Sequence, residues 1–138
     1  MAIQEKMKGN VFFDTSAIYA YINGKDPDHK KVKSSIERFS GTLVITNYIF
    51  DEVITLILSR LGHNTAIKVG NTLLNSPQVE KIWVTQKDEK EAWNLLSERK
   101  GKEYSFTDCI SFVVMRRADL KTYLATDQHF KQEGFEKI

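Results

Sequence analysis

Short apolar runs alternate with helical segments along the chain, and this alternation limits the fold more than any other feature of the sequence. Strands are expected at residues 11–13, 41–46, 79–85 and 122–126, with an edge strand at 135–138. Helical periodicity fills the intervals at 15–22, 29–39, 47–62, 63–76, 87–101 and 104–115, and a short turn or helix is expected at 128–134. This pattern predicts an α/β domain whose parallel sheet is covered by helices on both faces.

Length and composition indicate a single domain spanning residues 1–138. With 41% hydrophobic residues the chain can bury a core without metals or disulfides. Its single cysteine, Cys109, allows no internal disulfide and is expected to pack as a small buried hydrophobe. The N-terminus has no signal-like apolar run, and no apolar run is long enough to span a bilayer. We therefore expect a cytoplasmic protein with no membrane partner.

Four acidic residues fall where strands end or helices begin. Asp14 directly follows the first strand, and Asp127 closes the strand at 122–126. Glu52 lies near the start of the helix after the second strand, and Asp108 opens the helix that precedes the strand at 122–126. Ligands of open α/β sheets bind beyond the carboxyl ends of the strands, and right-handed connections bring these helix starts to that edge. The four carboxylates are therefore expected to meet in one crevice.

Such a cluster is unfavourable without a counterion. Two like charges 4 Å apart repel by roughly 4 kcal/mol at an effective dielectric constant near 20. Crowded acids therefore imply raised pKa values, a bound cation, or both. Carboxylate oxygens suit Mg²⁺ or Mn²⁺ better than zinc, and such a site can activate water against a phosphodiester. This chemistry points to metal-dependent hydrolysis of phosphoesters.

Each acid also has an ordinary structural interpretation. Asp14 could cap the helix at 15–22, and Asp127 could be a turn residue or cap the segment after it. Ser105 and Asp108 have the spacing of a capping box, in which the serine caps the helix and the acid reaches back. Capping and ligand roles are compatible for Asp108, because an acid held at a helix N-terminus can still offer an oxygen outward.

Glu52 forms a stripe with Thr55 and Ser59 on one helix face, which could be a solvated face and nothing more. The neighbouring Asp51 is expected to point elsewhere and is given no role. On the helix at 87–101, Trp93 is expected to face inward together with Leu95 and Leu96.

The remaining polar candidates are weaker. The three histidines share no metal-ligand spacing and are expected at the surface, although His129 lies close to Asp127 in sequence. Arg116 and Arg117 follow Asp108 by about two helical turns and are candidates for contact with a nucleic-acid backbone. The net charge of +2 favours an anionic partner only weakly.

Four segments, taken in order, resemble the PIN-domain family: "VFFDTSAIYAYI", "YIFDEV" with Glu52, "YSFTDCISFVVM" and "LATDQHF" followed by "GF". The likeness covers nearly the whole chain and is greatest to small prokaryotic members of the VapC toxin type. It is less clear between Gly62 and Trp83. The resemblance implies a three-layer α/β/α sandwich and Mg²⁺- or Mn²⁺-dependent endoribonuclease activity at an acidic cleft. It also implies a homodimer, an RNA substrate and a cognate antitoxin that blocks the cleft.

Carried over by position, the resemblance assigns the catalytic and metal-binding acids to Asp14, Glu52, Asp108 and Asp127. Ser105 would be the supporting hydroxyl at the helix start. Supporting contacts to the first acid are expected from Thr15 or Ser16.

Two other functions remain open at this point. A phospho-acceptor signalling domain also places acids and Mg²⁺ at the carboxyl edge of a parallel sheet. It would carry paired acids early and a lysine after a late strand, whereas this chain has the single Asp14 early and Asp127 late. The second alternative is a PIN fold that binds RNA or a partner without cutting it, against which the intact acids argue.

Overall fold

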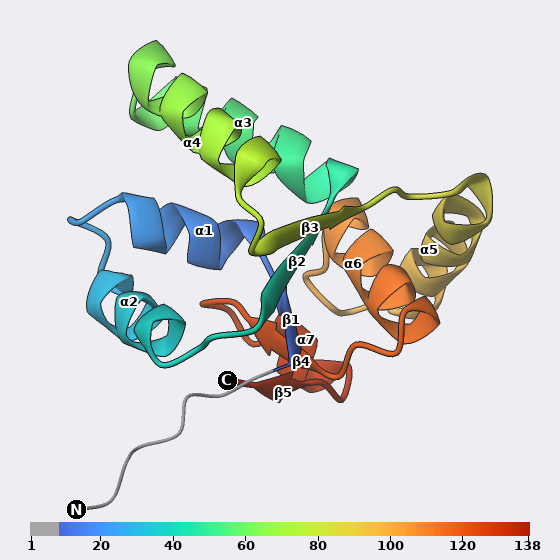
Figure 1. Cartoon of the computed structure of the whole chain (residues 1–138). Coiled ribbons are helices and arrows are strands. Elements are labelled where there is room, and N and C mark those ends of the chain that lie inside the picture. The colour runs from blue at the N-terminus through green and yellow to red at the C-terminus, as the bar shows by residue number, and fades with distance from the viewer. Residues whose placement is uncertain (1–8) are drawn as a thin grey trace, which may run out of the picture.

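A five-stranded sheet forms the centre of the computed structural model, which describes residues 9–138 (Figure 1). Its strands are β1 (Asn10–Phe13), β2 (Thr42–Thr46), β3 (Val79–Ile82), β4 (Thr122–Leu124) and β5 (Glu136–Lys137). The order across the sheet is β3-β2-β1-β4-β5, and all four pairings are parallel. The predicted parallel sheet is confirmed, including β5 at its edge. The expectation of no signal-like run rests largely on residues 1–8, which lie outside the described residues.

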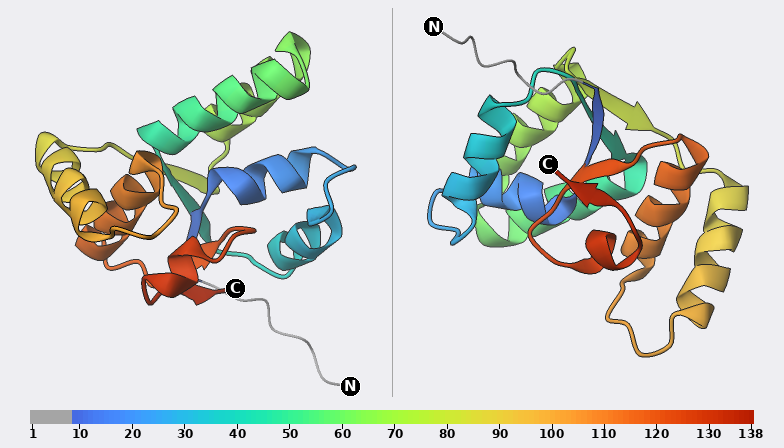
Figure 2. Two further views of the ribbon diagram at one scale, coloured as in Figure 1. Left: turned by 180° about the vertical axis from the view of Figure 1, so that it is seen from behind. Right: turned by 90° about the horizontal axis from the view of Figure 1, so that it is seen from below.

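Helices cover both faces of this sheet. They are α1 (Thr15–Ile22), α2 (His29–Glu37), α3 (Asn47–Arg60), α4 (His63–Asn75), α5 (Gln86–Glu98), α6 (Phe106–Arg117) and α7 (His129–Gln132). Helices α1 and α2 lie on one side of the sheet, and α5 and α6 lie on the other (Figures 1 and 2). The three-layer α/β/α arrangement is therefore confirmed. Within residues 9–138 no helix is both long and apolar enough to cross a membrane.

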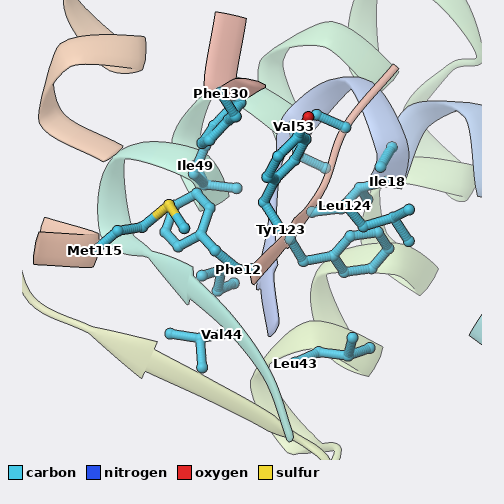
Figure 3. Packing of buried hydrophobic residues seen from close by; sticks show 14 of the residues in the cluster. Phe12, Ile18, Leu43, Val44, Ile49, Val53, Met115, Tyr123, Leu124 and Phe130 are labelled. Carbon is cyan, nitrogen blue, oxygen red and sulfur yellow. The ribbon is translucent and has the colours of Figure 1, made fainter. Parts of the chain in front are cut away.

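The central strands are apolar because both of their faces are covered. Phe12 of β1 and Tyr123 and Leu124 of β4 are almost completely buried, and the rings of Phe12 and Tyr123 pack with that of Phe130 of α7 (Figure 3). The ring of Tyr123 stacks on that of Phe130 with centroids 5.0 Å apart. Each such burial stabilises the fold by roughly 2 kcal/mol. This core fixes the carboxyl ends of β1 and β4 beside each other.

The orientation of Trp93 on helix α5 differs from the prediction. Leu95 is buried and Leu96 packs against the core, as expected, but Trp93 is 63% exposed. The buried face of α5 runs through Asp88, Ala92 and Leu95, at spacings of four and three residues. Trp93 follows Ala92 by one residue and is thus rotated by about 100° from that face.

Candidate active site

The first acid, Asp14, lies at the carboxyl end of β1 and is only 4% exposed. Its backbone N–H donates to the carbonyl of Leu124 at 3.0 Å, which ties the ends of β1 and β4 together. Its Oδ2 accepts the N–H of Ser16 at 3.2 Å and the Ser16 hydroxyl at 2.7 Å. Asp14 is therefore both the predicted N-cap of α1 and a buried carboxylate at the edge of the sheet.

The pKa of Asp14 is raised from 3.8 to about 7, and burial of the carboxyl group is the largest cause. Repulsion from Asp108 and Asp127 contributes to this rise, whereas the hydrogen bonds from Ser16 oppose it. Three of the four predicted acids are thus near enough to influence one another electrostatically. A carboxyl group with a pKa near 7 at the ligand-binding edge of a sheet is typical of a functional site.

Asp108 sits at the N-terminus of α6 in the predicted capping box. Ser105 Oγ accepts the N–H of Asp108 at 3.0 Å, and Asp108 Oδ2 accepts the N–H of Ser105 at 3.0 Å. The same Oδ2 lies 3.0 Å from Nδ1 of His129. Asp108 therefore caps its helix and also contacts the loop beyond β4.

Asp127 belongs to that loop. Its Oδ1 accepts the backbone N–H of His129 at 3.0 Å, and the N–H of the preceding Thr126 donates to Ser16 Oγ at 3.0 Å. A continuous series of contacts thus runs from Asp14 through Ser16 to the Asp127 loop and on through His129 to Asp108.

The three aspartates share a pattern of hydrogen bonding. In each, every hydrogen bond from the described residues goes to a single carboxylate oxygen: Oδ2 of Asp14, Oδ2 of Asp108 and Oδ1 of Asp127. The other oxygen of each carboxylate accepts none from residues 9–138. Each acid is therefore held in place through one oxygen, and the second oxygen is free of hydrogen bonds from residues 9–138.

Glu52 lies on α3, and its place beside the three aspartates stays a prediction, because they do not line the cavity that it lines. It is half-buried and lines a cavity of about 490 Å³ together with Thr55, Ser59 and Thr107, the residue before Asp108. The predicted stripe along α3 therefore forms a wall beside the N-terminus of α6. Asp51 is more exposed than Glu52 but lines the same cavity, and its lack of a role stays a prediction. Adjacent residues differ by about 100° around a helix, and this open cavity is wide enough to reach both.

His129 is the site residue that sequence analysis undervalued. It was expected at the surface, but its side chain is only 23% exposed and lies between two acids, with Nδ1 3.0 Å from Asp108 and 3.8 Å from Asp127. Its position two residues after Asp127 was the available signal. The contact with Asp108 spans 21 residues and depends on how α6 packs against the β4–α7 loop.

The two residues expected to support Asp14 differ. Ser16 donates to it twice, whereas the buried Oγ1 of Thr15 has no hydrogen-bond partner among the described residues.

The predicted burial of Cys109 is confirmed.

Arg116 and Arg117 lie at the C-terminal end of α6, about 12 Å along the helix from Asp108. Arg116 pairs with Glu133 at 3.1 Å, and Arg117 donates two hydrogen bonds to the buried carboxylate of Asp88 at 2.9 and 2.7 Å. Both guanidinium groups therefore have structural partners inside the chain. Contact of either arginine with RNA stays a prediction.

The donor set suits a hard divalent cation. Within residues 9–138 no three His, Cys, Asp or Glu side chains are close enough to form a complete metal cage. Mg²⁺ is usually held by one or two carboxylates, with waters and substrate oxygens as its other ligands. The open oxygens of Asp14 and Asp108 at a cluster of negative charge match that requirement.

Comparison with known protein families shows to which family the chain belongs. The model of the PIN domain matches residues 11–136. The chain belongs to the PIN-domain family. This confirms the resemblance seen in the sequence and argues against the phospho-acceptor alternative.

Relatives of known name include small nucleases of Mycobacterium tuberculosis. The chain is 32% identical over 128 residues to the 23S rRNA-specific endonuclease VapC20 of strain H37Rv. The aligned residues make up 93% of this chain and 97% of that protein. It is 25% identical over 121 residues to ribonuclease VapC26 of the same strain, and the aligned residues make up 87% of this chain and 89% of that protein.

Solved structures agree with this assignment. The crystal structure of M. tuberculosis VapC20, described as a Sarcin-Ricin loop cleaving toxin, superposes with a TM-score of 0.87 over 93% of this chain and 98% of that one. VapBC2 from Rickettsia felis, bound to a DNA fragment from its promoter, gives a TM-score of 0.69 at 14% identity, with 94% and 98% covered. The latter shows likeness of fold alone.

Proposed function

We propose that this PIN-domain protein is a metal-dependent endoribonuclease of the VapC toxin type. The observation that carries the proposal is the burial of Asp14 beside Asp108 and Asp127, which raises its pKa to about 7 at the carboxyl edge of the sheet. A buried carboxylate close to other acids is favoured in its ionised form by a divalent cation. The site would take Mg²⁺ or Mn²⁺.

The acids would divide the work of the site. Asp14 and Asp108 would hold the ion through their open oxygens, and Glu52 would complete the site from the α3 wall. Asp127, the more exposed aspartate with 35% of its side chain accessible, would orient the attacking water or complete the ligand set. A divalent ion bound there would lower the pKa of a bound water and neutralise charge on the phosphodiester.

RNA is the proposed substrate, and 23S rRNA is the first RNA to test, because VapC20 is named for cutting it. The acidic cleft repels a polyanion until the ion arrives, so basic residues at the rim must attract the RNA. Arg116 and Arg117 remain candidates for RNA contact, but each would have to break its ion pair within the chain to bind RNA.

A cognate antitoxin is the proposed protein partner. The named VapBC2 complex supports this proposal at the level of fold. We further propose a homodimer in the cytoplasm, as the family resemblance implies.

The test is cleavage of RNA by the purified protein with Mg²⁺, with Mn²⁺ and with a chelator. Substrates would include 23S rRNA, a structured control RNA and an unstructured RNA. We expect metal-dependent cleavage by the parent and none by Asp14→Asn. Metal-independent cleavage, or equal cleavage by Asp14→Asn, would overturn the assignment. RNA binding without cleavage would support the non-cleaving alternative.

A further inference from the structure

His129 lies between two of the proposed metal ligands. Its backbone N–H donates to Asp127 Oδ1 at 3.0 Å, and its Nδ1 lies 3.0 Å from Asp108 Oδ2. One residue therefore connects an acid on the β4–α7 loop to an acid on α6. These two acids reach the site from different elements.

The direction of the side-chain hydrogen bond follows from its neighbours. Both atoms near Nδ1, Asp108 Oδ2 and Asp127 Oδ1, are carboxylate oxygens, which accept hydrogen bonds when ionised. Nδ1 must therefore carry a proton and donate it. The bond adds a second donor to Asp108 Oδ2, which already accepts the N–H of Ser105.

We propose that His129 is a positioning residue for metal binding. By occupying Oδ2 of Asp108, it fixes the rotation of that carboxylate and leaves Oδ1 as the oxygen offered to the ion. This inference rests on the proposed function, because it assumes that Asp108 is a metal ligand.

The imidazole is itself held in place. The ring of Tyr104 packs edge-on against it with centroids 5.3 Å apart, and the Tyr104 hydroxyl donates to Glu133 at 3.0 Å. The next residue, Phe130, is fully buried in the core. His129 therefore has few alternative orientations. A side chain can orient a metal ligand only if it is itself held in one orientation.

Two substitutions separate positioning from packing. His129→Phe keeps an aromatic ring against Tyr104 but removes the donor. His129→Asn removes the ring but can place its amide N–H at the position of Nδ1. The measurement is the Kd for Mn²⁺, followed by the electron paramagnetic resonance signal of free Mn²⁺ at fixed pH. The melting temperatures of both variants are also measured without metal.

Removal of hydrogen bonds that orient metal ligands typically costs 10–100-fold in metal affinity. We expect His129→Phe to raise the Kd for Mn²⁺ by about 10-fold or more, and His129→Asn to stay within about 3-fold of the parent. The reverse order, or an unchanged Kd in His129→Phe, would overturn the positioning role. If the parent itself binds no Mn²⁺, the proposed function fails and the inference with it. Binding by the parent without RNA cleavage would contradict the nuclease assignment and leave the inference standing.

Discussion

The hydroxyl of Ser16 lies 2.7 Å from Oδ2 of Asp14, and its oxygen also accepts the N–H of Thr126 at 3.0 Å. Ser16 thus fastens the buried acid of β1 to the loop that carries Asp127. It also supplies the donors that counteract the rise in the pKa of Asp14.

Ser16→Ala should weaken metal binding. Without this hydroxyl the pKa of Asp14 rises further, so fewer molecules present an ionised ligand at pH 7. We expect the Kd for Mn²⁺ to rise by about 10-fold and the free energy of unfolding to fall by about 1 kcal/mol. Ser16→Thr keeps the hydroxyl and serves as the control in titration and urea unfolding. Equal affinities in Ser16→Ala and the parent would mean that the hydroxyl has no part in the site.

Asp14→Asn should change how stability depends on pH. Because the folded pKa of about 7 exceeds the unfolded value of 3.8, the folded state retains a proton that the unfolded state loses. The stability of the metal-free parent should therefore decrease as pH rises from about 4 to about 7.

Asparagine caps helices as well as aspartate and does not ionise. With a chelator present, Asp14→Asn should match the parent near pH 4 and exceed it at pH 8 by on the order of 3 kcal/mol. Urea unfolding at both pH values is the measurement. A parent and variant with parallel pH profiles would show that Asp14 does not titrate abnormally.

Asp108→Asn should abolish cleavage without lowering the melting temperature of the metal-free protein. The amide oxygen can still accept from Ser105, and one of the repelling charges is removed. A large drop in melting temperature would instead favour capping as the main role of this acid.

Asp88→Asn is the matched control, since Asp88 occupies the same place in the capping box of α5. It pairs with Arg117, which lies at the opposite end of α6 from Asp108. Its loss should cost about 2 kcal/mol of unfolding free energy and leave cleavage intact.

Glu52→Gln and Asp51→Asn form a second matched pair, since both residues line the same cavity. Only Glu52 is a proposed ligand, so Glu52→Gln should reduce cleavage by about 100-fold or more, whereas Asp51→Asn should change it by less than about 3-fold. Initial rates of RNA cleavage at saturating Mg²⁺ are the measurement. A greater loss in Asp51→Asn would reassign the ligand on α3.

The strands and helices were predictable because local periodicity decides them. The strand expected at 79–85 shows where this fails, since β3 ends at Ile82. The N–H of Val84 bonds to the side chain of Asn47, and Thr85 caps α5. Polar contacts of this kind end a strand that apolar residues alone would continue.

The proximity of Asp14, Asp108 and Asp127 was predictable for a topological reason, because parallel strands present their carboxyl ends at one edge. The contact of His129 with Asp108 was not predictable, because it depends on packing between distant segments. The same holds for the ion pair between Arg117 and Asp88, which lie 29 residues apart.

Binding of a divalent cation by Asp14 and Asp108 can be seen by anomalous diffraction from crystals of this protein soaked in Mn²⁺. We expect one strong peak within direct coordination distance of Asp14 and Asp108, on the side of their open oxygens. A peak elsewhere on the molecule, or none at Mn²⁺ concentrations that support RNA cleavage, would contradict this expectation.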